Sequence, residues 1–203
     1  GKSTQIPKLL LYALAMIDYK ANGKIICSQP RIPPTVENAN TISNQMGVPI
    51  KEYSPIYKKY IKSDNYNILF KYKKDSHQVN QNGLQLNIVT DGTLLEIIKK
   101  SPILKDVDKN GNYKSTKNVY DIVIVDEAHE HNKNMDLILT FMKTATYYNN
   151  DIRLVIVSAT MDDDEPNYRR YYKDINDNRL FPLNLDIQKY NIDRVNVDRR
   201  LHI

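Results

Sequence analysis

The chain has 203 residues, a formal charge of +5 and 41% hydrophobic residues, enough for one domain of ordinary size with a real core. Its single cysteine, Cys27, excludes an intramolecular disulfide, and no apolar run approaches the roughly 20 residues that span a bilayer. The positive charge suits a polyanionic partner but is too small to indicate one by itself.

Hydrophobic periodicity predicts alternating strands and helices along the first half of the chain. Apolar residues recur at helical spacing up to Ile17, which predicts a loop and helix over residues 1–21. The elements expected next are a buried strand at Lys24–Ser28 that includes Cys27, a helix from Pro33 to about Gly47, and strands at Ile68–Tyr72 and Leu86–Thr90.

The second half continues this alternation. Asp91 is expected to cap a helix that runs to Lys100, and residues 101–118 are expected to form a polar surface loop. The remaining predicted elements are a buried strand at Tyr120–Val125, a helix over 133–149, a strand at Ile152–Val157 and a helix over 165–174. The alternation favours an α/β fold with a parallel sheet, which binds ligands at the carboxyl ends of its strands.

The first four residues, Gly1-Lys2-Ser3-Thr4, match the end of the phosphate-binding pattern G-x-x-x-x-G-K-[ST]. Backbone N–H groups at a helix N-terminus attract phosphate oxygens. Lys2 would add a full charge near the outer phosphates, and the Ser3 hydroxyl would bind Mg²⁺. Alone the match is weak, because a random chain of this length carries G-K-[ST] roughly one time in ten.

An acidic motif, Asp126-Glu127-Ala128-His129, follows the predicted strand that ends at Val125. Asp126 would hold Mg²⁺, and Glu127 would polarise the water that attacks the γ-phosphate. On an extended chain, adjacent side chains point in opposite directions, so the two acids would serve different ligands. Chance produces this tetrapeptide in roughly one chain per thousand, so together with G-K-[ST] it predicts a nucleotide-hydrolysis site.

Hydroxyls follow the last predicted strand, in Ser158-Ala159-Thr160. Ser158 and Thr160 are expected to hydrogen-bond the acidic motif and to couple it to the state of the phosphate. His129 is interpreted as a polar coupler beside the nucleotide. His129 and His131 stand two apart with no cysteine nearby, which is a poor pattern for zinc.

Together these motifs resemble the DEAH group of helicase superfamily 2. Gly1–Pro7 is similar to that group's first motif. Ser28–Arg31 resembles its T-Q-P-R-R motif, with Ile32 in place of the second arginine, and Thr90–Leu95 resembles T-D-G-x-L-L. Asp126–Asn132 is most similar to viral members, in particular the poxvirus-type nucleoside triphosphate phosphohydrolase/RNA helicases.

The resemblance implies a RecA-like P-loop NTPase lobe, with a mostly parallel sheet flanked by helices, that binds ATP or another NTP with Mg²⁺. It implies RNA-stimulated hydrolysis coupled to 3′-to-5′ translocation and duplex unwinding. It also places Arg31, Thr90 and Asp91 along the nucleic-acid strand, through backbone contacts without sequence preference. The implied location is cytoplasmic, in a viral factory or virion, with a nuclear location left open, and no membrane partner is expected.

The predicted lobe covers residues 1–185 and is expected to lack the strand that precedes the phosphate loop. Residues 186–203 are expected to begin a connection to a second lobe outside this sequence. The family's arginine finger and its Q-x-x-G-R-x-G-R motif belong to that second lobe. Because an arginine finger contributes roughly 10³–10⁵ in rate, we expect the isolated chain to be nearly inactive.

Other functions stay open from the sequence alone. A DNA helicase, or a translocase that does not unwind, carries the same motifs. A catalytically weak nucleic-acid-binding scaffold is disfavoured because Lys2, Asp126 and Glu127 are all intact. A P-loop kinase or transport ATPase would lack the T-D-G and S-A-T motifs.

The stretch Lys51–Lys74 is rich in tyrosine and lysine and includes Tyr57, Lys58 and Lys59. Interleaved aromatic and basic side chains can stack on bases and meet phosphates of a single strand. A solvated insertion explains the same composition, and from the sequence alone it is the favoured interpretation.

Overall fold

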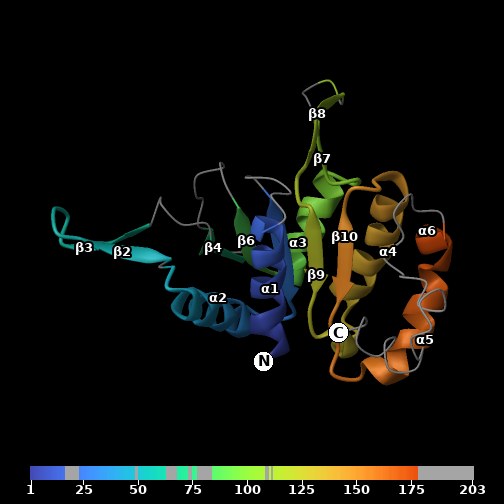
Figure 1. Ribbon diagram of the computed structural model, residues 1–203, viewed down its shortest axis with the longest axis horizontal. Coiled ribbons are helices and arrows are strands. Elements are labelled where there is room, and N and C mark those ends of the chain that lie inside the picture. The colour runs from blue at the N-terminus through green and yellow to red at the C-terminus, as the bar shows by residue number, and fades with distance from the viewer. Residues whose placement is uncertain are drawn as a thin grey trace.

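The computed structural model describes residues 1–16, 23–48, 50–62, 68–72, 75–76, 84–107, 110 and 112–177. The strands of its main sheet are β1 Lys24–Gln29, β4 Ile68–Tyr72, β5 Asp75–Ser76, β6 Gln85–Thr90, β9 Ile122–Val125 and β10 Arg153–Ile156. They lie in the order β10-β9-β1-β6-β4-β5 (Figure 1). All neighbours from β10 to β4 are parallel, and the edge strand β5 is antiparallel to β4. The predicted mostly parallel sheet is confirmed.

Helices cover both faces of this sheet. They are α1 Lys2–Met16, α2 Ile32–Met46, α3 Asp91–Lys100, α4 Lys133–Tyr148, α5 Met161–Tyr171 and α6 Lys173–Asp177, with a short 3-10 helix, η1, at Ala128–Glu130. Residues of α1 and α2 join the core on one face, whereas residues of α3 and α4 join the core on the other (Figure 1). None of the described helices is long and apolar enough to cross a membrane.

Successive residues of β1 enter these two cores in turn. Ile25 and Cys27 pack in one cluster with Leu14 of α1 and Ile42 of α2. Ile26 belongs to the other cluster, with residues of α3 and α4. A strand covered on both faces is expected to be apolar throughout, as β1 is. The predicted burial of Cys27 as a small core residue is confirmed.

The predicted polar loop over 101–118 is wrong. Residues Lys105–Val107 (β7) and Tyr113–Asn118 (β8) pair as an antiparallel hairpin, which projects from the end of the sheet opposite the start of α1 (Figure 1). Its base is anchored by buried amides, because Asn149 Nδ2 donates to Asn118 Oδ1 at 2.9 Å. This long-range contact lets a polar segment form a strand.

Smaller differences concern the ends of elements. Thr90, not Asp91, occupies the extended N-cap position of α3, and Asp91 is the first helical residue. The helix predicted over 165–174 is two helices, α5 and α6, which meet at Tyr172. The connection predicted at 186–203 lies outside the described residues.

A second hairpin stands apart from the main sheet. Strands β2 Lys51–Ser54 and β3 Lys59–Lys62 are antiparallel and extend away from the body beyond the end of α2 (Figure 1). The sequence predicted only one strand in this region, Ile68–Tyr72, which is confirmed as β4. The hairpin was missed because its strands carry few apolar residues.

Candidate functional site

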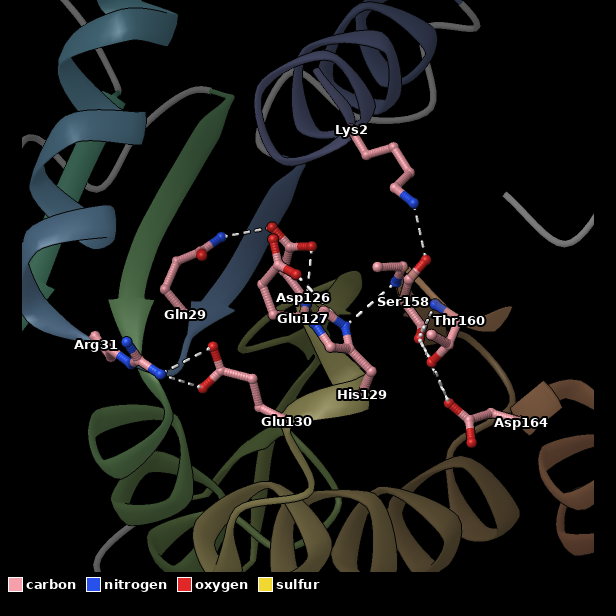
Figure 2. Close-up of polar contacts among 11 residues, drawn as sticks. Lys2, Gln29, Arg31, Asp126, Glu127, His129, Glu130, Ser158, Thr160 and Asp164 are labelled. Atoms are coloured by element: carbon pink, nitrogen blue, oxygen red, sulfur yellow. Dashed lines mark hydrogen bonds and ion pairs between the residues drawn. The ribbon is translucent and has the colours of Figure 1, made fainter. Parts of the chain in front are cut away.

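The predicted motifs meet at one edge of the sheet. Strands β1, β6, β9 and β10 are parallel, so their carboxyl ends share that edge, as expected from the sequence. The start of α1 lies there too, because Lys2 Nζ donates to the backbone carbonyl of Ser158 at 2.9 Å (Figure 2). The first and last motifs, 156 residues apart in the chain, are therefore in contact.

The N-terminus of α1 begins immediately after Gly1, whose carbonyl accepts hydrogen bonds from the N–H groups of Thr4 at 3.3 Å and Gln5 at 2.9 Å. Helix geometry leaves the first N–H groups, those of Lys2 and Ser3, without a partner inside the helix. No acidic side chain occupies the first turn of α1. Exposed amides, the helix dipole and Lys2 give this end of the helix a positive potential suited to phosphate.

Asp126 is buried, with 1% of its surface exposed, and both of its carboxylate oxygens accept hydrogen bonds. Gln29 Nε2 donates to Oδ2 at 2.7 Å, and the Glu127 N–H donates to Oδ1 at 2.9 Å (Figure 2). Gln29 ends β1, next to β9, and is itself 1% exposed. The sequence did not predict this role for Gln29; only the pairing of β1 with β9 reveals it.

Glu127 departs from the extended geometry assumed from the sequence. Its backbone is left-handed, with φ 55° and ψ 40°, a conformation that costs a non-glycine residue of order 1–3 kcal/mol. The turn, rather than strand alternation, therefore separates the two acids. It leaves Asp126 buried and the Glu127 side chain 38% exposed, so the two carboxylates have different environments.

His129 connects the acidic motif to the end of β10. Its Nδ1 accepts a hydrogen bond from the Ala159 N–H at 3.2 Å, and the neighbouring Ala128 N–H donates to the Val157 carbonyl at 2.9 Å. Glu127 Oε2 lies 3.5 Å from the same Nδ1. Because Nδ1 already accepts from Ala159, we assign the ring proton to Nε2, so Glu127 is not hydrogen-bonded to this ring.

Ser158 and Thr160 are joined through a carboxylate that the sequence did not single out. Asp164 Oδ2, in the first turns of α5, lies 3.3 Å from Thr160 Oγ1 and 3.5 Å from Ser158 Oγ (Figure 2). Its Oδ1 lies 3.7 Å from Nε2 of His131, just beyond the acidic motif. Asp164 therefore links the S-A-T residues to the segment that follows Glu127.

Thr90 and Asp91 lie at the start of α3, beside the acidic segment. Thr90 Oγ1 is 3.0 Å from Thr93 Oγ1. Asp91 is 2% exposed and accepts a hydrogen bond from Asn132 Nδ2 at 2.8 Å. Asn132 in turn caps α4 by accepting from the Met135 N–H at 3.0 Å. The Asp91 carboxylate thus fixes the start of α4, a role that the sequence did not predict.

Arg31 lies at the N-cap of α2, and its side chain is 70% exposed. Its Nη2 is 3.3 Å and 3.4 Å from the two carboxylate oxygens of Glu130 (Figure 2). An exposed ion pair of this kind contributes about 0–1 kcal/mol. A phosphate could therefore replace Glu130 as the partner of Arg31 at little cost.

The sequence profile of the family described as DEAD/DEAH box helicase matches residues 9–167. The chain belongs to the DEAD/DEAH box helicase family. The match includes the T-D-G, acidic and S-A-T motifs and begins after Gly1-Lys2-Ser3-Thr4, so the contact of Lys2 with Ser158 is the structural evidence that ties the first motif to the rest.

Several curated proteins are similar to this chain. It is 56% identical over 216 aligned positions to the Acanthamoeba polyphaga mimivirus protein named "Putative ATP-dependent RNA helicase R366", which covers all of the chain and 12% of that protein. It is 29% identical to ATP-dependent RNA helicase HrpA of Borreliella burgdorferi, over 79% of the chain and 16% of that protein. Human ATP-dependent RNA helicase DHX30 is 29% identical over 85% of the chain and 12% of its own length. The chain thus spans less than a fifth of each of these relatives.

The burial of Asp91 gives the site a testable pH dependence. Burial raises the pKa of its carboxyl above the ordinary value, while the Asn132 amide and the nearby Ser28 hydroxyl oppose this in part. Asp91 Oδ1 and Ser28 Oγ are nevertheless buried without a hydrogen bond of acceptable geometry. A raised folded-state pKa means that the domain loses stability as the pH rises from the unfolded pKa through the folded one.

We expect Asp91→Asn to stabilise the domain at neutral pH. The amide removes the buried charge and can donate to Ser28 Oγ, a hydrogen bond that contributes roughly 1 kcal/mol. Thermal melts at neutral pH and below pH 3.8 should show the gain shrinking in acid, where Asp91 is protonated in the parent. Asp151→Asn, the same change on an exposed residue, is the control. A loss of stability at neutral pH would contradict this account of Asp91.

Proposed function

We propose that this domain is the RecA-like, ATP-binding lobe of an RNA helicase, in which ATP hydrolysis drives movement along nucleic acid and duplex unwinding. The observation that carries the proposal is the meeting of three motifs at one sheet edge, where Lys2 reaches Ser158 beside the buried Asp126. The names of the mimivirus, Borreliella and human relatives support an RNA substrate and ATP.

Nucleotide binding would use the N-terminus of α1. The N–H groups of the first turn would accept the phosphates, and Lys2 would exchange the Ser158 carbonyl for outer phosphate oxygens. Glu127 would accept a proton from the attacking water, a role that suits a half-exposed carboxylate free of the His129 ring. Asp126 cannot take this role, because both its oxygens are held in the interior.

The donors present fit Mg²⁺ bound together with a nucleotide. Among the described residues, no group of three or more His, Cys, Asp or Glu side chains could hold a metal by itself. Mg²⁺ is typically bound by one or two protein oxygens while phosphates and waters complete its shell, and Asp126 with the Ser3 hydroxyl matches that pattern. When bound, Mg²⁺ would neutralise charge that develops on the phosphates.

Coupling would run from the phosphates to the nucleic-acid face through two hydrogen-bonded links. His129 joins the acidic motif to Ala159, and Asp164 joins Ser158 and Thr160 to His131. On the other side of the motif, Glu130 pairs with Arg31. We assign backbone contacts with nucleic acid to Arg31 and Thr90, while Asp91, being buried, would position them.

ATP hydrolysis by the full-length protein, measured alone, with single-stranded RNA and with single-stranded DNA, tests this proposal. We expect hydrolysis to be stimulated more by RNA than by DNA. Equal stimulation would favour a DNA helicase or general translocase. Binding of RNA without hydrolysis under any of these conditions would instead favour a scaffold lobe, and would contradict the assignment of Glu127.

A further inference from the structure

The tip of the β2–β3 hairpin gathers exposed apolar and cationic side chains. Ile56 is 85% exposed and Tyr57 is 67% exposed. Lys58, also exposed, turns the chain with a left-handed φ of 50°, and Lys59 Nζ lies 6.0 Å from the centroid of the Tyr57 ring. The Tyr57 N–H donates to Ser54 Oγ at 3.4 Å, which fixes the turn. An aliphatic residue, an aromatic ring and two cations therefore stand together in solvent.

The register of the hairpin repeats this combination along its strands. Lys51 is paired with Lys62, and Tyr53 is paired with Tyr60. Because residues two apart in a strand belong to the same face, these four positions share one face of the ribbon. Like charges directly opposite one another are destabilising, and a two-stranded hairpin by itself is marginally stable. A polyanion along this face would relieve the repulsion of the paired lysines.

The hairpin also lies on the side of the domain to which Arg31 points the proposed nucleic-acid face. Helix α2 begins at Ile32, next to Arg31, and its C-cap is Gly47, four residues before the hairpin. Fifteen helical residues span about 22 Å. Figure 1 shows the hairpin beyond the far end of this helix, projecting from the body. A strand that leaves Arg31 along α2 would reach it.

We propose that the β2–β3 hairpin is a second binding site for single-stranded nucleic acid, an inference that rests on the proposed function. Tyr57 stacks on a base, and Lys58 and Lys59 contact neighbouring phosphates. The partner that fits is one that presents flat ring faces and negative charges at short, regular intervals. The Ile56, Tyr57 and lysine side chains offer no paired donor and acceptor with which to read a base edge, so binding is independent of sequence.

Fluorescence anisotropy of the full-length protein with a labelled single-stranded oligouridylate, over a range of salt concentrations, tests this site. Lys58→Asn combined with Lys59→Gln removes two charges, and asparagine tolerates the left-handed turn. The salt slope should fall by about 1.4, at roughly 0.7 per phosphate contact. Tyr57→Ala should weaken binding about tenfold, whereas Tyr57→Phe, which keeps the ring, should not.

The matched control is Lys99→Gln with Lys100→Gln, two adjacent exposed lysines in the last turn of α3, which should leave the salt slope unchanged. Equal melting temperatures of the hairpin variants and the parent would show that the fold is intact. Parental affinity and salt slope in both hairpin variants would overturn the inference while the parent still binds RNA. Absence of RNA binding by the parent would instead overturn the proposed function together with it.

Discussion

Glu127→Gln should reduce the turnover number for ATP by about 10²–10⁴ while leaving ATP affinity close to that of the parent. Glutamine keeps the size and shape of the side chain but cannot accept a proton from the attacking water. The surrounding geometry should persist, because the backbone N–H of Glu127, not its side chain, holds Asp126. Affinity would be measured with a fluorescent ATP analogue, and turnover by phosphate release with saturating RNA.

Glu96→Gln is a suitable control, since it makes the same change on an exposed face of α3. It should leave both affinity and turnover at parental values. Retained turnover in Glu127→Gln would remove this residue from the chemistry. Loss of ATP affinity in that variant would mean that Glu127 acts in binding, and would leave the identity of the base to another group.

The sequence predicted the placement of the motifs well, because each follows a short apolar strand. Parallel strands bring their carboxyl ends to one edge, so Asp126 after β9 and Ser158 after β10 had to lie near each other once the α/β fold was recognised. The start of α1 was less certain from the sequence, since G-K-S-T alone is common. Its contact with Ser158 is what assigns it to the same site.

The residues that orient these motifs could not be predicted in the same way. Gln29 and Asp126 are 97 positions apart, and their hydrogen bond depends on the pairing of β1 with β9. Asp164 looked like one of several acids after S-A-T until the first turns of α5 placed it against Thr160. The left-handed backbone of Glu127 is imposed by its surroundings, because glutamate has no local preference for positive φ.

The two hairpins were missed for a related reason. Periodicity detects strands through their apolar face, and a strand that buries little apolar surface gives little signal. In β8 the stabilising contact is the buried amide pair of Asn118 and Asn149. In β2 and β3 the paired residues are tyrosines and lysines, which the sequence alone suggested only as a solvated insertion.

Lys2→Ala should abolish detectable ATP binding at concentrations that saturate the parent, and should lower turnover by at least about 10²–10³. The substitution removes the one full positive charge at the start of α1, where the remaining donors are backbone amides. Glu127→Gln and Lys2→Ala therefore have opposite effects on affinity, one sparing it and the other removing it. A pair of variants with this contrast separates phosphate binding from water activation.

A thermal shift assay checks the binding half of this prediction without relying on turnover. A ligand that binds the folded state at 100 times its dissociation constant stabilises it by about 2.7 kcal/mol, so a non-hydrolysable ATP analogue should raise the melting temperature of the parent and not that of Lys2→Ala. The control is Lys8→Ala on the same helix, whose Nζ is bonded to Gln45 Oε1 at 2.6 Å, far from Ser158 in the chain. It should keep the full shift. A parental shift in Lys2→Ala would contradict the phosphate site at α1, because that lysine is the residue whose contact with Ser158 joins the first motif to the acidic one.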